Sequence, residues 1–185
     1  MPKINLLVRN ATALNEDGSI NEEAYRQFLQ RFVDAGIGVY LGSAGSAEGG
    51  AMTADELRRI YRLGVDVCKG KVQVNGNPPE KPTVRETLEH IRLAIEGGVE
   101  IVNVYGPPGW HAFRPTDEEY AGFFDELLQE VKHPVAIAPN RIHSTCRKVS
   151  PQSDLPGESP DRITDAHNIR RRRSHVRVQR NCHYR

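Results

Sequence analysis

The chain has 185 residues, of which 38% are apolar and 26% charged, with a formal net charge of +1 at pH 7, the composition of an ordinary globular protein with a hydrophobic core. It contains no run of 18 apolar residues and no signal-peptide core, which argues against membrane and secreted proteins, so we expect a cytoplasmic location without a membrane partner. The three cysteines, at positions 68, 146 and 182, are widely spaced and indicate neither a disulfide framework nor a zinc site, and we expect no cofactor.

The charge is unevenly distributed and divides the chain at residue 140. Residues 141–185 contain ten Arg and one Lys against three Asp and one Glu, a net charge of +7, so residues 1–140 carry −6. Only seven of these 45 residues are Leu, Ile, Val or Phe, too few to offset the entropy of ordering the segment. We therefore expect residues 1–140 to form the fold and residues 141–185 to be a basic, disordered tail.

The first predicted elements lead to a glycine-flanked loop. An apolar run at residues 4–8 predicts a strand, and Asn21 can cap a helix whose apolar side chains recur every three or four residues. Gly36 ends this helix, and the apolar run 37–41 predicts a buried strand. That strand opens into Gly42-Ser43-Ala44-Gly45, where small residues allow a ligand to approach the backbone closely.

Three further helices begin with the same pattern, a threonine followed three residues later by a glutamate. The pairs are Thr53 and Glu56, Thr83 and Glu86, and Thr116 and Glu119. In such a capping box the two side chains satisfy amide groups that the first helical turn leaves without partners. Short β-branched runs between the helices predict further strands at residues 72–75, 101–105 and 135–138.

Strands and helices thus alternate about every 30 to 35 residues, which predicts an α/β protein with parallel strands and right-handed crossovers. Both an open doubly wound sheet and a (β/α)8 TIM barrel have this alternation. The first strand lacks a Gly-x-Gly-x-x-Gly fingerprint, which argues against a nucleotide-binding open sheet, and long polar loops after several strands favour the barrel. Because a complete barrel needs about 250 residues, we expect a partial barrel of four βα units and a fifth strand.

Functional groups in parallel βα folds lie at the carboxyl ends of the strands. There, Ser43 offers a hydroxyl and neighbouring amides that can bind a carboxylate, although an ordinary Gly-Ser turn contains the same residues. Tyr105 can serve as a general acid or base, or can pack at the end of its strand. Other residues in these loops that suit either a site or the surface are Glu48, Trp110, His111, Arg114 and Asn140.

The order and spacing of several motifs resemble the amino-terminal half of the dihydrodipicolinate synthase and N-acetylneuraminate lyase superfamily. They are Asn15-Glu-Asp-Gly-Ser-Ile20, Asp34-Ala-Gly-Ile-Gly38 leading to Gly42-Ser-Ala-Gly45, Met52-Thr-Ala-Asp-Glu56, Gly97-Gly98, and Pro115-Thr-Asp-Glu-Glu119 through His133-Pro134. The resemblance implies a (β/α)8 barrel, usually dimeric or tetrameric, so a full barrel would be a homo-oligomer. It also implies a lyase or aldolase that cleaves or condenses pyruvate or a related 2-keto acid through a lysine Schiff base.

The resemblance also implies roles for particular residues. Ser43 takes the place of the first threonine of the family's Gly-Thr-Thr-Gly-Glu loop, which holds the keto acid's carboxylate, and Ala44 takes the place of the second. Glu48 matches the loop's glutamate after a two-residue insertion, and Tyr105 is a shifted candidate for the family's catalytic tyrosine. The substrate-binding residues implied in this way are Gly42, Ser43, Ala44, Gly45, Glu48 and Asn140.

The Schiff-base lysine that the resemblance requires is absent from the region where a sixth strand is expected. Lys148 is the only lysine after residue 140, and the sequence around it is not an apolar strand. We interpret the break at residue 140 as a reading-frame shift, because an out-of-frame GC-rich gene yields arginine enrichment and loss of periodicity. Three hypotheses follow: a Schiff-base lyase or aldolase, a truncated and inactive relative, and polyanion binding by the Arg-rich tail, which no nucleic-acid motif supports.

Overall fold

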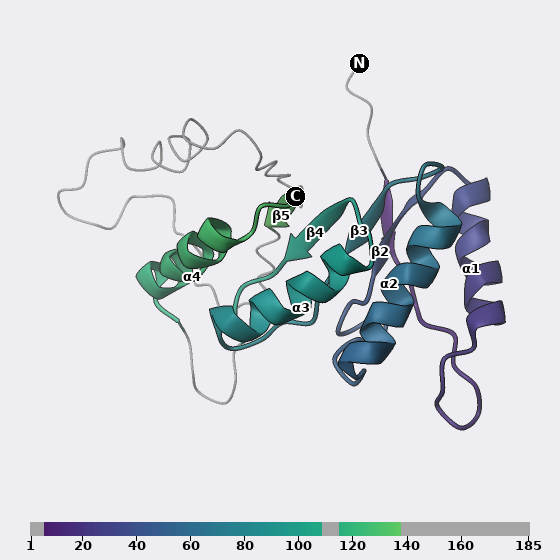
Figure 1. Ribbon diagram of the computed structural model, residues 1–185, viewed down its shortest axis with the longest axis horizontal. Helices are drawn as coiled ribbons and strands as arrows, with labels where there is room; N and C mark the ends of the chain where they lie inside the picture. Colours follow the sequence, from purple (N-terminus) through teal and green to yellow (C-terminus); the bar gives the residue numbers. More distant parts are fainter. Residues whose placement is uncertain (1–5, 109–114, 138–185) are drawn as a thin grey trace, which may run out of the picture.

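The computed structural model describes residues 6–108 and 115–137. They form a five-stranded parallel sheet with the strands in chain order (Figure 1). The strands are β1 (Leu7–Arg9), β2 (Gly38–Leu41), β3 (Val74–Gly76), β4 (Ile101–Val104) and β5 (Val135–Ile137), and the helices are α1 (Glu22–Asp34), α2 (Ala54–Cys68), α3 (Val84–Glu96) and α4 (Asp117–Glu130). Each helix connects two neighbouring strands, so the predicted βα alternation is confirmed.

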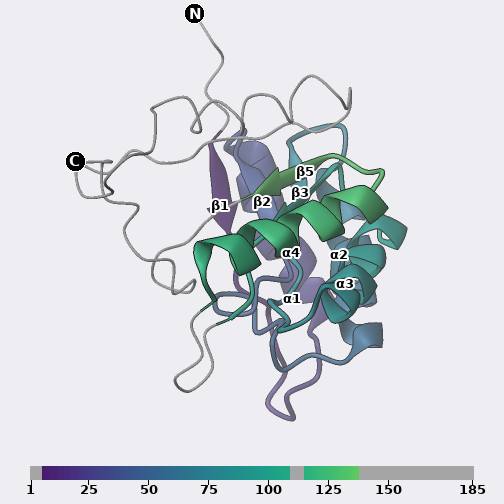
Figure 2. The ribbon, with the colours of Figure 1, turned by 90° about the vertical axis from the view of Figure 1, so that its left-hand side faces the viewer.

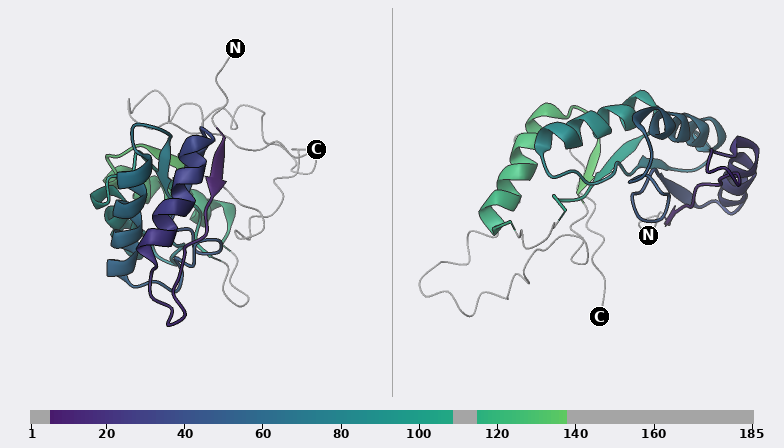
Figure 3. Two further views of the ribbon diagram at one scale, coloured as in Figure 1. Left: turned by 90° about the vertical axis from the view of Figure 1, so that its right-hand side faces the viewer. Right: turned by 90° about the horizontal axis from the view of Figure 1, so that it is seen from below.

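The four helices cover one side of the sheet. The right-hand view of Figure 3 shows them following one another in an arc over the strands, and Figure 2 shows the arrangement from the end at which α4 lies. An open doubly wound sheet instead has helices on both faces and a reversal of strand order at a switch point. Sequential parallel strands with helices on one side are the arrangement of a TIM barrel, so the partial barrel expected from the sequence is confirmed.

Alternate residues of the strands pack against the helices and form the hydrophobic core. Val39 is paired with Val74 in the β2–β3 register, and both side chains are fully buried. The helix α2 lies close to β2 because Gly64 has no side chain: a Cβ at this position would be 2.3 Å from Cδ1 of Leu41. The core therefore depends on a small residue in α2 as well as on the apolar strands.

The other face of the sheet carries polar side chains. Arg9, Tyr40 and Asn75 are aligned across β1, β2 and β3 by the strand register. Asn75 is fully buried and donates from Nδ2 to Oδ1 of Asn103 at 2.7 Å, while its own Oδ1 accepts from Gln73 at 2.9 Å. In a barrel this face lines the interior, so the strands bring polar groups to the inside of the curved sheet.

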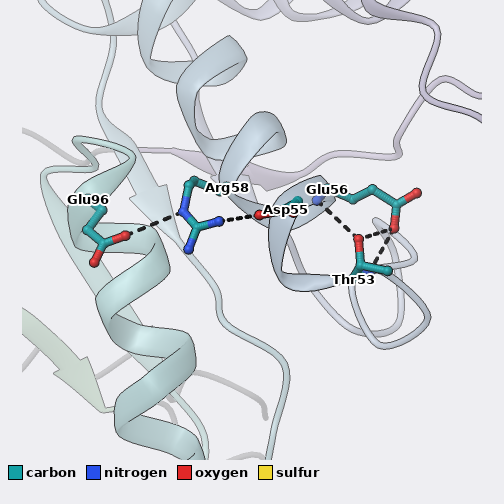
Figure 4. Close-up of polar contacts among 5 residues, drawn as sticks. All are labelled: Thr53, Asp55, Glu56, Arg58 and Glu96. Carbon is teal, nitrogen blue, oxygen red and sulfur yellow. Dashed lines mark hydrogen bonds and ion pairs between the residues drawn. The ribbon is translucent and has the colours of Figure 1, made fainter.

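Figure 4 shows how α2 begins and how it is joined to α3. The hydroxyl oxygen of Thr53 accepts from the Glu56 N–H at 3.3 Å, and the Glu56 carboxylate accepts from the Thr53 N–H at 2.8 Å, which completes the predicted capping box. On the same helix, Arg58 pairs with Asp55 and reaches Glu96 of α3 at 3.4 Å. These pairs are largely exposed, so the buried core contributes more to the α2–α3 contact than they do.

The remaining two predicted capping boxes differ. At Thr116 both reciprocal bonds with Glu119 are formed. The hydroxyl of Thr83 accepts from the Glu86 N–H at 3.2 Å, but the Glu86 carboxylate accepts from that hydroxyl and not from the Thr83 backbone. The third box is therefore only half formed, although Thr83 still caps α3.

Several strand boundaries differ from the prediction, mostly by one or two residues, and two of the differences have a clear cause or consequence. β1 reaches Arg9, which pairs with Tyr40 and is part of the strand and not of the following loop. β3 begins two residues later than expected, because the amides of Lys71 and Val72 both bond to the carbonyl of Cys68 and prolong the turn after α2. Within the described ranges, no helix combines the length and apolar character needed to cross a membrane.

Candidate functional site

The loop after β2 is folded tightly around the carbonyl of Ser43. This carbonyl accepts from the amide of Ala47 at 3.1 Å and from the amide of Gly49 at 3.0 Å. Thr12, after β1, donates from its hydroxyl to the carbonyl of Ala47 at 2.8 Å. Backbone bonds and a neighbouring strand end therefore fix the shape of the loop.

Gly42 begins this loop with a conformation that only glycine adopts easily. Its φ is +74°, and a Cβ at this position would lie 2.6 Å from the hydroxyl oxygen of Tyr61 and 2.8 Å from two of its ring carbons. Tyr61 is fully buried in α2, and burial strongly raises the pKa of its phenol. The loop thus lies directly on a neutral aromatic side chain of the core.

A pocket of about 230 Å³ opens at the carboxyl ends of four neighbouring strands. Its lining residues come from the end of β1 and the loops after β2, β3 and β4; they are Arg9, Ser43, Ala44, Gly45, Glu80 and Tyr105. Ser43 is only 5% exposed, whereas Gly45 is exposed. The pocket therefore combines a buried hydroxyl, an open stretch of backbone, one cation and one carboxylate.

Arg9 and Tyr105 form a direct pair across this pocket. Nη2 of Arg9 donates a hydrogen bond to the phenolic oxygen of Tyr105, and the guanidinium carbon lies 5.4 Å from the centroid of the Tyr105 ring. Burial raises the pKa of Tyr105, Arg9 opposes this rise, and the carboxylate of Glu80 adds to it. Because the net shift is upward, the phenol is protonated at neutral pH and can donate a hydrogen bond to a ligand.

A buried hydrogen-bonded pair lies next to the end of β1. Asn10 follows Arg9 and is fully buried, and its Nδ2 donates to the phenolic oxygen of Tyr25 in α1. Burial raises the pKa of Tyr25 far above its ordinary value, so this phenol does not ionise near neutral pH. Asn10 and Tyr25 therefore position the strand end and take no part in proton transfer.

A second hollow, of about 400 Å³, lies between α1 and α2, away from the strand ends. It is lined by Glu22, Arg26, Asp55, Arg58, Arg59, Arg62, Leu63 and Asp66. Most of these charges are already paired, for example Arg26 with Asp66 at 3.3 Å. Paired charges on an open helix surface leave little for a ligand, so we place the candidate site at the strand ends.

The structure brings together some of the sequence-predicted residues. Ser43, Ala44, Gly45 and Tyr105 all line the pocket, whereas Gly42 packs on Tyr61 and is not among the lining residues. Glu48 is exposed, has a φ of +58° and is not among the lining residues. The other candidates, Trp110, His111, Arg114 and Asn140, lie outside the described residues.

Sequence reasoning missed two residues of the pocket. Arg9 was given no role, although its alternation along β1 with Val8, which packs against the core, was a usable signal of the face on which it lies. Glu80 follows two prolines in the loop after β3, and no pattern in the sequence marked it.

Comparisons with known proteins agree with the fold and the motifs. A curated relative, the 4-hydroxy-tetrahydrodipicolinate synthase of Campylobacter jejuni subsp. doylei, is 24% identical over 137 residues, which cover 72% of this chain and 45% of the relative. Among solved structures, dihydrodipicolinate synthase DapA-2 from Bacillus anthracis has a TM-score of 0.68 at 19% identity and covers 80% of this chain and 49% of its own. No protein-family model matches the chain.

A further solved structure is that of YagE from E. coli K12, a prophage protein of the dihydrodipicolinic acid synthase family, in complex with pyruvate. It has a TM-score of 0.67 at 19% identity and covers 78% of this chain and 47% of its own. The chain thus spans about half the length of the proteins it matches. The resemblance to the amino-terminal part of dihydrodipicolinate synthase-like proteins, inferred from the motifs, is confirmed.

Proposed function

We propose that the pocket at the ends of β1 to β4 binds a small 2-keto acid such as pyruvate, as one part of the active site of a lyase or aldolase. The observation that carries this proposal is the convergence of Ser43, Gly45 and Tyr105 from separate strand ends on one pocket. The similarity to dihydrodipicolinate synthases and to YagE, which was solved with pyruvate, supports the choice of ligand.

The loop after β2 can bind a carboxylate through its backbone. The amides of Ala44 and Gly45 donate to no other residue within the described part of the chain, so they remain available to a ligand. Gly45 is exposed and lacks a side chain, which allows a carboxylate to approach the backbone closely. The hydroxyl of Ser43 can donate a further hydrogen bond from a nearly buried position.

Tyr105 supplies proton donation on the opposite side of the pocket. Its oxygen already accepts from Arg9, so its own O–H can be directed to the carbonyl or hydroxyl oxygen of the ligand. The raised pKa keeps that proton in place at neutral pH, so the phenol is available as a donor to the ligand and not as a general base. We therefore assign Tyr105 the role of proton donor to the oxygen of the bound keto acid.

The amine that a Schiff base requires is not part of this pocket. None of the residues that line it is a lysine, and the only lysine in the sequence after β5 is Lys148. A nucleophilic amine must be desolvated or placed beside another cation to lose its proton near neutral pH. The described pocket thus contributes binding and proton donation, while covalent chemistry needs a group from outside it.

Titration of the protein with pyruvate, followed by calorimetry or ligand-detected NMR, tests the proposal. Ser43→Ala removes one neutral hydrogen bond and is expected to weaken pyruvate binding about two- to tenfold. Ser19→Ala is the matched control, because Ser19 lies in an exposed turn outside the pocket. A wild-type protein that does not bind pyruvate would contradict the proposal.

Borohydride reduction in the presence of pyruvate tests the covalent step separately. For the 185-residue chain we expect no stable adduct by mass spectrometry, because the sequence has no lysine where the sixth strand of the family is expected. This outcome, together with measurable pyruvate binding, would favour the inactive relative as the form that this sequence encodes. An adduct on a specific lysine would instead identify an active lyase or aldolase.

A further inference from the structure

The pocket contains a cation that keto-acid binding by the 42–45 loop does not use. We propose that Arg9 is a specificity-determining residue that binds a second carboxylate of the ligand, so that the preferred substrates are 2-keto dicarboxylic acids. This inference rests on the proposed function, because it states which residue binds the other end of the same keto-acid ligand.

Arg9 is oriented toward the pocket but keeps most of its hydrogen-bonding capacity. One N–H bond goes to Tyr105, and the aromatic ring lies beside the guanidinium. A guanidinium has five N–H donors, so several remain for a ligand. Arg9 forms no ion pair with any residue in the described ranges, whereas Arg26 and Arg59 on the helices are each paired with an acid.

The positions of Arg9 and the loop suit a ligand with an anionic group at each end. Arg9 is aligned with Tyr40 in the β1–β2 register, and Ser43 follows Tyr40 by three residues. Three residues of extended chain span at most about 10 Å, which limits the distance between the backbone at Tyr40 and that at Ser43. The long side chain of Arg9 can bring its guanidinium closer to the loop than this backbone distance. A short dicarboxylic acid can therefore place one carboxylate on the loop and the other on Arg9.

Glu80 determines which anion suits this position. Its carboxylate lines the same pocket and is close enough to Tyr105 to raise the pKa of the phenol. A dianionic phosphate would be repelled more strongly by Glu80 than a monoanionic carboxylate would. A planar carboxylate also matches the two parallel N–H groups of a guanidinium, so we assign a carboxylate and not a phosphate to the Arg9 position.

Two ligands that differ only at the far end test this assignment. 2-Oxoglutarate and 2-oxopentanoate have the same chain length and the same keto-acid head, but the first ends in a carboxylate and the second in a methyl group. Calorimetric titration at low salt is expected to show 2-oxoglutarate binding about tenfold or more tightly, because a charged hydrogen-bond pair is gained. Raising the salt concentration should reduce this preference.

Variants of the two charged residues separate their contributions to the preference. Arg9→Gln is expected to abolish the affinity ratio between the two ligands, and Arg9→Lys to retain part of it because the charge remains but the planar fork is lost. Glu80→Gln is expected to increase the ratio, because it removes a negative charge beside the second carboxylate. Circular dichroism spectra that match the wild type would establish that each variant is folded.

The outcomes distinguish this inference from the proposed function. Equal affinity of the wild-type protein for the two ligands would overturn the inference and leave keto-acid binding intact. An unchanged ratio in a folded Arg9→Gln variant would also overturn it. Failure of both ligands and of pyruvate to bind would overturn the proposed function, and the role of Arg9 with it.

Discussion

Replacement of Gly42 by alanine should destabilise the protein through two separate effects. The left-handed φ of +74° costs an L-residue about 1–2 kcal/mol. The new Cβ would also lie 2.6–2.8 Å from the hydroxyl and ring of Tyr61, and overpacking of this kind typically costs about 1–3 kcal/mol. We therefore expect Gly42→Ala to lower the free energy of unfolding by about 2–5 kcal/mol and to displace the loop proposed to bind the ligand.

Gly36→Ala is a matched control for this experiment. Gly36 has a φ of +67°, but a Cβ there would meet no atom within 4 Å, so only the conformational cost of about 1–2 kcal/mol applies. Urea unfolding of both variants measures the difference. In a Tyr61→Leu background the extra cost of Gly42→Ala should shrink, which a double-mutant cycle would detect. Equal destabilisation by the two glycine substitutions would refute the argument that Tyr61 fixes the loop.

Two further predictions concern packing and ionisation. Gly64→Ala should cost about 1–3 kcal/mol in urea unfolding, because its Cβ would lie 2.3 Å from a buried leucine of β2. Gly122→Ala in α4 adds a methyl group in open space and should instead stabilise by about 0.5–1 kcal/mol, so the opposite order would contradict the α2–β2 packing. The pKa of Tyr105 should fall in Glu80→Gln and rise in Arg9→Gln, because the first removes a neighbouring negative charge and the second a positive one. Absorbance titrations compared with Tyr105→Phe measure this shift. Keto-acid binding should be constant around neutral pH and weaken only at a pH above that at which an ordinary tyrosine ionises, because the pKa of Tyr105 is raised.

The fold could be predicted from the sequence because the signals that determine it are local. The capping boxes at Thr53 and Thr116 satisfy amides within one helical turn, and both are formed as predicted. The apolar strand at residues 37–41 is followed directly by the glycine-rich loop. The position of this strand in the series of alternating strands and helices could therefore be predicted from neighbouring residues alone. Boundaries such as the start of β3 were less accurate, because the turn after α2 extends through backbone bonds to Cys68 that no side-chain pattern marks.

The pocket was only partly predictable because its membership depends on the register between strands. Ser43 and Tyr105 were found from their places at strand ends, whereas Arg9 depends on the pairing of β1 with β2 and on which face of the sheet it occupies. Glu80 reaches the pocket from a loop that contains two prolines and carries no periodic signal. Each missed residue thus lies where a contact between segments distant in the sequence sets the geometry.

The proposed function separates ligand binding from covalent chemistry along the chain. The loop proposed to bind a carboxylate, the proposed proton donor Tyr105 and Arg9 all lie in the first four βα units, whereas the Schiff-base lysine that the resemblance implies is expected on a strand after β5. The proposed binding therefore needs only groups that the described residues supply, and it can be tested whether or not an amine is present. A keto-acid complex that resists borohydride reduction would show that the two functions can be assigned to different parts of the barrel.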